Sequence, residues 1–232
     1  MSFKVLYVTA TMPEAEALKR ISGIMSLMGG YRFGNLEISV LVTGVGSAAT
    51  AWGIKQWISE NGKPDLAING GIAGSYKIEK FAIGDVVMPG TDCFADSGIE
   101  DGEIFLTLFE AGLSAADEFP FQNGLLHTDA RYSIRIKTLL KSVNAITVNS
   151  ATGSECTKIK LINKYNPDIE TMEGATFFYI CAMENIPFLA LRAISNRVEP
   201  RDKSKWNIGA AINSLNHELV KLYTFLSDRT FN

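Results

Sequence analysis

The sequence has little of what several common kinds of functional site require. Its two histidines, His127 and His217, are too few for a histidine-centred triad or for most zinc sites, and its three cysteines stand far apart without a CxxC pair. The net charge is only −3, and no run of about five like charges or about eighteen apolar residues occurs. These absences argue against a metal centre, a disulfide framework, a nucleic-acid surface and a membrane span.

The first residues show neither the charged leader nor the cleavage pattern of a secretory signal. We therefore expect a cytoplasmic protein that acts on a small molecule, without a metal or other cofactor and without a nucleic-acid or membrane partner.

The composition is that of an ordinary globular protein, with 47% hydrophobic and 20% charged residues. No break in composition divides the chain, so we expect a single domain over residues 1–232. Apolar strand patterns alternate with helical patterns along the whole chain. The sequence therefore predicts an α/β fold with a mixed, mostly parallel central sheet flanked by helices on both faces.

The expected elements can be placed by residue number. We expect strands at 3–9, 36–43, 65–70, 144–150, 168–172 and 187–195, and one or two strands within 84–96. We expect helices from Pro13 to Ile21, after Gly44–Ser47, and at 129–141, 155–165, 173–185 and 205–227. The segment 97–128 is predicted to be irregular, and a loop of that length is typical of a lid or of part of a site.

Polar residues follow the ends of several predicted strands. Glu14 comes after the first strand, Glu173 follows a later one, and Ser195 and Asn196 end the last. Because ligands bind at the carboxyl ends of parallel strands, we expect these residues to lie at one site. Glu173 stands among apolar residues, where burying an unpaired charge is costly. Its carboxylate should therefore pair with a protein group or with the hydroxyls of a ligand.

Two glutamates with an amide side chain suit the cleavage of an N-glycosidic bond. One carboxylate can activate water, the other can hold ribose hydroxyls, and the amide can stabilise the departing base. The reaction passes through an oxocarbenium-like sugar, which nearby negative charge stabilises in the transition state.

A second motif suggests a different function. GVGSAA at 44–49 matches the dinucleotide fingerprint G-x-G-x-x-G/A and lies between a strand and a helix. In that fingerprint an acidic residue ends the next strand, whereas Asp65 precedes its strand in a KPD turn. We therefore expect the glycines to permit a tight turn, although amides at the start of a helix can also hold an anion.

Segments along nearly the whole chain resemble the nucleoside phosphorylase and nucleosidase superfamily. They are, in order, VTATMPEAEAL, VTGVGSAATAWG, INGGIAG, IGDVV, TMEGA and RAISN. The likeness is closest to hydrolases of methylthioadenosine and adenosylhomocysteine. The ending RAISNRVEPRDKSKW is similar to that of the futalosine hydrolases, which release hypoxanthine in a pathway of menaquinone biosynthesis. The resemblance implies a purine nucleoside as substrate and a homo-oligomer with sites near the subunit interface.

The same resemblance implies roles for individual residues. Glu14 would activate the attacking water, Glu173 would bind the ribose hydroxyls with Met172 beside it, and the base would contact Asn196 and a loop at 152–154. The residues of that loop are Thr152, Gly153 and Ser154. The adenine-cleaving relatives have an aspartate where this chain has Asn196. An amide can donate a hydrogen bond to a 6-oxopurine without being protonated, so hypoxanthine is the expected base.

Further features bear on the nucleophile and on the rest of the substrate. The loop NGGIAGSY lacks the arginine with which phosphorylases of the superfamily bind phosphate, so water is the expected nucleophile. Arg197 and Arg201 follow Asn196, with Trp206 beyond them, and a guanidinium near an aromatic ring suits the benzoate of futalosine. Ser195 is expected to support the substrate site rather than to act as a nucleophile.

Three other functions stay open at this point. The chain could be a methylthioadenosine/adenosylhomocysteine nucleosidase, against which Asn196 argues, or a phosphorylase that depends on phosphate. It could also be a nucleoside-binding module without turnover, which would have no need of Glu14.

Overall fold

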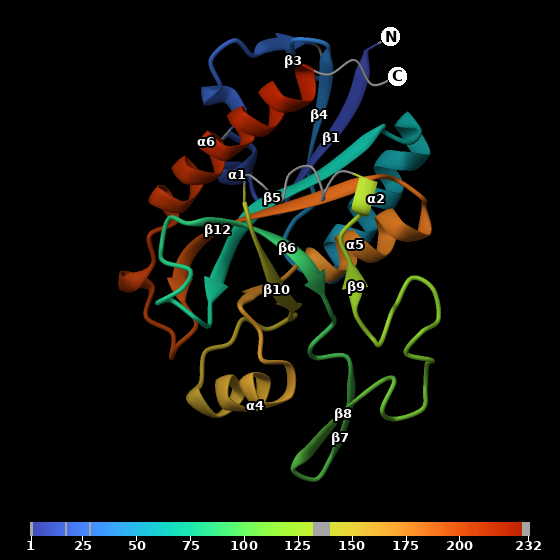
Figure 1. Cartoon of the computed structure of the whole chain (residues 1–232), viewed down its shortest axis with the longest axis vertical. Coiled ribbons are helices and arrows are strands. Elements are labelled where there is room, and N and C mark those ends of the chain that lie inside the picture. Colours follow the sequence, from blue (N-terminus) through green and yellow to red (C-terminus); the bar gives the residue numbers. More distant parts are fainter. Residues whose placement is uncertain (1, 17, 28, 132–139, 229–232) are drawn as a thin grey trace.

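A computed structural model describes residues 2–16, 18–27, 29–131 and 140–228 of the chain (Figure 1). Most of its strands form one ten-stranded mixed sheet, ordered β11-β10-β6-β12-β5-β1-β4-β3-β2, with β9 paired to β6. The strands are β1 (Phe3–Thr9), β2 (Met25–Leu27), β3 (Gly30–Phe33), β4 (Leu36–Val42), β5 (Leu66–Ser75), β6 (Val86–Asp92), β9 (Leu126–His127), β10 (Lys141–Thr147), β11 (Ile169–Thr171) and β12 (Phe188–Arg197). Strands β7 (Gly98–Asp101) and β8 (Ile104–Thr107) form a separate hairpin.

Helices cover both faces of this sheet. In Figure 1, α6 lies along one side, and α2 and α5 lie along the other. The described helices are α1 (Met12–Glu16), α2 (Ser47–Asn61), α4 (Glu155–Tyr165), α5 (Gly174–Met183) and α6 (Ile208–Ser227), with short 3-10 turns at η1 (Leu18–Arg20) and η2 (Lys203–Lys205).

Strand β1 shows why both faces are covered. Its alternate residues Val5 and Tyr7 belong to the hydrophobic cluster that contains the buried leucines of α6. Leu6 and Val8 point to the opposite face and join the cluster that contains Ile54 of α2 and the phenylalanines of α5. A strand whose two sides are both apolar requires a helical layer on each side, as the sequence predicted.

Half of the sheet closes on itself. Strand β5 pairs with β12, β12 with β6, β6 with β10, and β10 with β11, while β11 pairs back to β5. These five strands therefore form a continuous ring. The longest ladder, between β12 and β5, is parallel, whereas the β11–β5 and β12–β6 pairings are antiparallel. The prediction of a mixed, mostly parallel sheet is confirmed.

Most of the expected strands and helices are present, and the differences are local. Strands β2 and β3 were not predicted; they form an exposed edge that pairs with β4. The segment predicted to be irregular contains the β7–β8 hairpin, in which Gly102 has a φ of 62°. The Asp-Gly pair at 101–102 is the signal for this hairpin. The helix expected at 129–141 falls largely on residues outside the described part, and its last residue, Lys141, begins β10.

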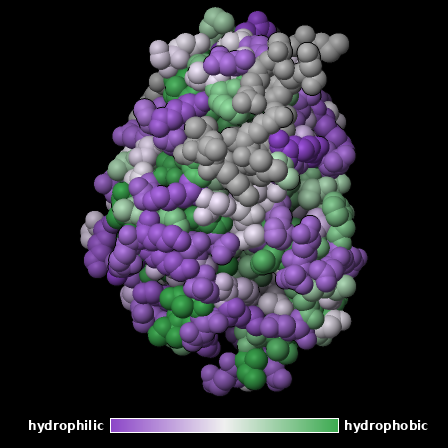
Figure 2. Space-filling view, viewed as in Figure 1, coloured by the Kyte–Doolittle hydropathy of each residue, from purple (hydrophilic) through white to green (hydrophobic). Residues whose placement is uncertain are grey.

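The face shown in Figure 2 is largely hydrophilic, with hydrophobic residues in small separate groups. One of these groups lies at the lower end, where Figure 1 places the β7–β8 hairpin. Ile104 of this hairpin is 62% exposed. Among the described residues, no helix has the length and apolar character needed to cross a membrane.

Candidate active site

Glu14 lies in α1, directly after β1, and is almost fully buried. One carboxylate oxygen, Oε2, accepts hydrogen bonds from the backbone N–H of Thr11 at 2.9 Å and from its hydroxyl at 2.8 Å. The other, Oε1, accepts from the backbone N–H of Ile72 in β5 at 3.1 Å. Three donors from two segments thus fix the carboxylate in one orientation, as hydrogen bonds to an ionised acceptor do.

Glu173 reaches the same region from the opposite part of the ring. Strand β11 runs antiparallel to β5, with Glu170 opposite Gly74, so the chain after β11 returns along β5 toward Gly71. Glu173 is the N-cap residue of α5, and its Oε1 accepts a hydrogen bond of 2.9 Å from the backbone N–H of Gly46 at the start of α2. This antiparallel pairing explains how two glutamates distant in sequence meet.

Arg192 interacts electrostatically with both carboxylates and is 1% exposed. Its guanidinium donates to the backbone oxygens of Asn69 at 2.9 Å and Leu191 at 3.0 Å, and also to the Asn69 side-chain oxygen. A Cβ atom at Gly71 would lie 3.0 Å from Oε1 of Glu14 and 3.9 Å from Nη1 of Arg192. A side chain at Gly71 would therefore crowd the Glu14 carboxylate and touch Arg192.

The electrostatics of the site follow from this arrangement. Burial raises the pKa of Glu173, and the nearby charge of Glu14 raises it further, whereas the Gly46 amide and Arg192 lower it. Burial also lowers the pKa of Arg192, while its interactions with Glu173, Asp92 and Glu14 raise it. Within the described part of the chain, neither glutamate forms an ion pair within 4.0 Å. The three carboxyl groups of Glu14, Asp92 and Glu173 thus surround one guanidinium, that of Arg192.

The glycine-rich turn before α2 serves this site. The backbone N–H of Gly46 donates to Glu173, and that of Ser47 donates to the Asn149 side-chain oxygen at 3.4 Å. Gly44 and Gly46 have φ values of 91° and 92°, which favour glycine. The anion at this helix start is the protein's own carboxylate, which leaves these two amides engaged and argues against a dinucleotide phosphate there.

Asn196 lies further along β12, opposite Gly74 of β5. Its Oδ1 accepts from the Ser195 hydroxyl at 2.8 Å, and its Nδ2 donates to the backbone oxygen of Arg197 at 2.9 Å. The register shifts between Ile194 and Asn196, so Ser195 forms a bulge. Ser195 is 1% exposed and orients the Asn196 amide from within the fold.

The loop at 152–154 is tied to the same level of the sheet. Glu170, which lies opposite Gly74, accepts from the backbone N–H of Thr152 at 2.8 Å and from the Tyr76 hydroxyl at 2.7 Å. Burial is the main cause that raises the pKa of Tyr76, so this phenol stays protonated and donates. Gly153 is exposed, and Ser154 caps α4 by accepting from the N–H of Thr157 at 3.1 Å.

The remaining predicted residues lie around this arrangement at different depths. Met172 is half-buried directly before Glu173. Arg197 is exposed and forms an ion pair with Glu79 at 2.5 Å, so its guanidinium is engaged at the surface. Arg201 is exposed, and its Cβ would lie 3.7 Å from a Cβ built on Gly153, beside the 152–154 loop.

Sequence reasoning missed several groups at this site. Asp92, Asn69, Arg192 and the backbone amides of Gly46 and Ile72 were not among the predicted residues. Asp92 and the two amides contact or face a predicted residue, and Asn69 binds Arg192. In the sequence, Asp92 ends an apolar strand, which is the kind of signal that selected Glu173. In the structure, Asp92 is 0% exposed. The amides carry no signal in the sequence, because every residue type other than proline supplies one.

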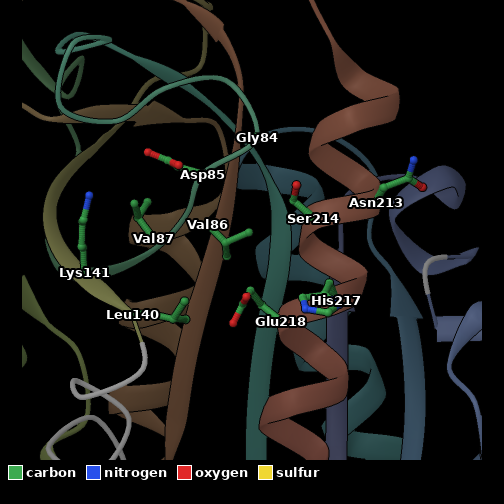
Figure 3. Close-up of a pocket in the computed structure, with 10 residues that line it drawn as sticks. All are labelled: Gly84, Asp85, Val86, Val87, Leu140, Lys141, Asn213, Ser214, His217 and Glu218. Carbon is green, nitrogen blue, oxygen red and sulfur yellow. The ribbon is translucent and has the colours of Figure 1, made fainter.

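A large cavity elsewhere does not contain these residues. It has a volume of about 530 Å³ and lies between β6 and α6 (Figure 3), where Ser214 and His217 of α6 face Val86. Among the described residues, no group of three or more His, Cys, Asp or Glu side chains could hold a metal ion.

Comparison with known proteins bears on the whole chain. A family model described as the phosphorylase superfamily matches residues 8–227. The chain belongs to the phosphorylase superfamily. Of its curated superfamily relatives, a futalosine hydrolase of Acidothermus cellulolyticus is 30% identical over 233 residues, which cover 96% of this chain and 91% of the relative. A 5'-methylthioadenosine/S-adenosylhomocysteine nucleosidase of Shewanella loihica is 27% identical over 204 residues, covering 84% and 83%.

Solved structures of the superfamily confirm the predicted fold. The structure of futalosine hydrolase from Helicobacter pylori aligns with a TM-score of 0.77 and covers 97% of this chain and 99% of its own, at 16% sequence identity. The single-domain α/β architecture is therefore that of the phosphorylase superfamily.

Proposed function

We propose that this protein hydrolyses the N-glycosidic bond of a purine nucleoside, namely futalosine, to give hypoxanthine and dehypoxanthinylfutalosine. The observation that carries the proposal is the meeting of Glu14 and Glu173 beside the buried Arg192. The relation to futalosine hydrolases in sequence supports the choice of substrate. If so, the protein acts in menaquinone biosynthesis.

In this proposal Glu14 is the general base. It takes a proton from water as the water oxygen attacks C1′ of the ribose, and the bond between C1′ and the base nitrogen breaks, with its electron pair leaving on the base. Glu14 and Glu173 together outnumber the guanidinium of Arg192, and their negative charge stabilises the oxocarbenium-like sugar. Glu173 accepts hydrogen bonds from the ribose hydroxyls, and Met172 lies against the sugar.

In this proposal the base lies further along the sheet than the ribose. Asn196 lies opposite Gly74, two residues beyond the Ile72 amide that holds Glu14. At about 3.3 Å per residue, this is roughly 7 Å, the scale of the separation between a ribose and its base. The loop at 152–154, tied to Glu170 at this level, would contact the base from the other side.

The hydrogen bonds of Asn196 support a preference for hypoxanthine. Its Oδ1 accepts from Ser195, and one amide hydrogen is used by the backbone oxygen of Arg197. The second amide hydrogen is available to N7 or O6 of a 6-oxopurine. An adenine would present an amino group at C6, against which an amide donor is mismatched.

Two features support water rather than phosphate as the nucleophile. The Gly46 amide, which could hold a phosphate oxygen, donates to Glu173 instead. The segment at 69–75 contains no arginine, and the excess of buried carboxylates would repel a phosphate ion.

The far end of futalosine carries an aryl carboxylate, for which Arg197 and Arg201 are the proposed partners. Arg201 is exposed beside the 152–154 loop. Arg197 would exchange its exposed ion pair with Glu79 for the substrate, and such surface pairs are worth only about 0–1 kcal/mol.

We further propose that the protein is a cytoplasmic homo-oligomer. Three apolar residues near Glu14 and Gly46 in the sequence are exposed: Met12 at 56%, Val45 at 55% and Trp52 at 72%. A second copy of the chain would cover them, as exposed apolar groups of this kind favour. Light scattering during size-exclusion chromatography tests this: a mass of 25.3 kDa, that of one chain, would contradict it.

The function is tested by incubating the purified protein with futalosine, methylthioadenosine and adenosylhomocysteine in separate reactions, with and without phosphate. Base release is followed by chromatography. Hypoxanthine release from futalosine without phosphate is the expected result. Adenine release without hypoxanthine would identify the nucleosidase alternative, strict dependence on phosphate would identify a phosphorylase, and binding without cleavage would identify a nucleoside-binding module.

A further inference from the structure

The start of α5 is stabilised in an unusual way. Its N-cap residue, Glu173, makes no side-chain hydrogen bond to the first turn of the helix. Two threonines from neighbouring strands do so instead. The N–H of Gly174 donates to the Thr171 hydroxyl at 3.2 Å, and the N–H of Ala175 donates to the Thr147 hydroxyl at 2.8 Å. An N-cap side chain ordinarily accepts from the second or third N–H of its helix, and here Thr147 accepts from the second, so the Glu173 side chain is left for another task.

Asp92 orients Thr147, the threonine that is more distant from α5 in the sequence. The Thr147 hydroxyl lies 2.9 Å from Oδ1 of Asp92 and 3.1 Å from the Thr171 hydroxyl. A hydroxyl has one hydrogen to donate, and a carboxylate is its strongest acceptor here. When Thr147 donates to Asp92, its lone pairs face the Ala175 amide and the Thr171 hydroxyl. The N–H of Cys93, at 2.8 Å, fixes Oδ1 itself.

The second oxygen of Asp92 contacts the first residue of α5 directly. Oδ2 is buried and has no hydrogen-bond partner among the described residues. It lies 2.2 Å from the position that a Cβ on Gly174 would take, so it packs flat against that glycine. Arg192 and the positive end of the α5 dipole favour its charged form, while burial, the larger effect, raises the pKa of Asp92 to about 7. A glycine directly after Glu173 is therefore a requirement of Asp92.

We propose that Asp92 is a positioning residue, which acts through Thr147 and Gly174 to hold the start of α5 so that the Glu173 carboxylate is free to bind the ribose. Because Asp92 is 0% exposed, we assign it no contact with the substrate. The inference rests on the proposed function, because it assigns Asp92 a role only through Glu173.

The test compares variants that weaken or remove the hydrogen bond between Thr147 and Asp92 with one that keeps it. Asp92→Asn removes the charge at constant size, Thr147→Val removes the hydroxyl at constant shape, and Thr147→Ser restores the hydroxyl. We expect Asp92→Asn and Thr147→Val to lower kcat for hypoxanthine release and to raise KM, with kcat falling on the order of 10- to 100-fold, because small displacements of a positioned group cost rates of this size. Thr147→Ser should stay within about 3-fold of the wild type.

A double-mutant cycle separates positioning from general destabilisation. In a Glu173→Gln background, Asp92→Asn should change kcat by less than about 2-fold, because the group through which it acts is already altered. Leu226→Ala in the α6 core is the stability control: it should lower the melting temperature without changing kcat well below that temperature.

A second readout does not depend on turnover. Amide hydrogen exchange at residues 174–176 should quicken in Asp92→Asn and Thr147→Val but not in Thr147→Ser. If Asp92→Asn fails to fold, the two Thr147 variants give the same comparison.

The outcomes distinguish the inference from the function. An active wild type with unchanged kcat and KM in both Asp92→Asn and Thr147→Val would overturn the inference alone, even if amide exchange quickens. The inference would also be overturned if Asp92→Asn lowered kcat by the same factor in the wild type and in the Glu173→Gln background. A wild type that releases no base from any nucleoside would overturn the proposed function, and the role of Asp92 with it.

Discussion

Replacing Glu14 by glutamine tests the proposed general base at nearly constant shape. The glutamine oxygen can take the place of Oε2 and accept from both donors of Thr11, but its NH₂ group then faces the N–H of Ile72, which Oε1 accepts in the wild type. Leaving one buried donor unpaired costs about 1–3 kcal/mol of stability. For a chain of this length we therefore expect a fall in melting temperature of roughly 2–12 °C.

The loss of transition-state stabilisation should be larger than this loss of folding stability and can be measured separately. A positioned general base contributes about 10²- to 10⁴-fold, so kcat should fall by that factor, or about 2.7–5.4 kcal/mol of transition-state stabilisation. Nucleoside binding should persist, because Glu173 and Asn196 keep their places. Steady-state hypoxanthine release gives kcat, and thermal melting with and without nucleoside gives stability and binding.

The matched control is Glu16→Gln in the same short helix. Glu16 is exposed and, among the described residues, pairs only with Lys19, at 3.3 Å, so the change should alter stability by less than about 1 kcal/mol and leave kcat unchanged. If Glu14→Gln kept more than about a tenth of the wild-type kcat, Glu14 would not be the base and the proposed mechanism would be wrong.

Three further predictions concern the other side chains of the site. Glu173→Gln should lower kcat/KM about 10- to 150-fold by weakening charged hydrogen bonds to the ribose, and initial rates over a range of futalosine concentrations would show it; unchanged kinetics would count against ribose binding by Glu173. Asn196→Asp should raise the ratio of adenine to hypoxanthine release at least about 10-fold in a competition assay, and an unaltered ratio would contradict the amide argument. Burial raises the pKa of Asp92 from 3.8 to about 7, so the folded protein holds this proton more tightly than the unfolded chain. The wild type should then lose stability relative to Asp92→Asn as pH rises from about 4 to 7, with no further change above 7; urea unfolding at several pH values tests this, and a pH-independent difference would refute it.

The parts of the fold that the sequence predicted are those that local pattern determines. The strand at 3–9 and the helix at 155–165 were placed with the bounds that the structure has, because their apolar residues follow the periods of a strand and a helix. Strand β10 begins at Lys141 rather than at 144, because pairing with β6 draws polar residues into the ladder. Tertiary pairing of this kind overrides local propensity and leaves no local signal.

The site was predictable only in its ionisable side chains. The strand-end rule selected Glu14 and Glu173, and the structure brings both to Arg192. The rule could not indicate that the Gly46 amide binds Glu173, because the contact depends on how β11 returns along β5. Nor could it indicate the bulge at Ser195, which changes the side of the sheet that Asn196 faces.

The closure of the five-stranded ring has a consequence for how substrate and fold depend on each other. Strand β11 has only three residues, yet it joins β10 on one side to β5 on the other, and Glu173, the proposed ribose-binding residue, follows it by two positions. If β11 separated from its neighbouring strands, the Glu173 carboxylate would move away with it. A bound nucleoside should thus stabilise the pairing of β11, so that the strand separates less often and its backbone amides exchange more slowly with solvent.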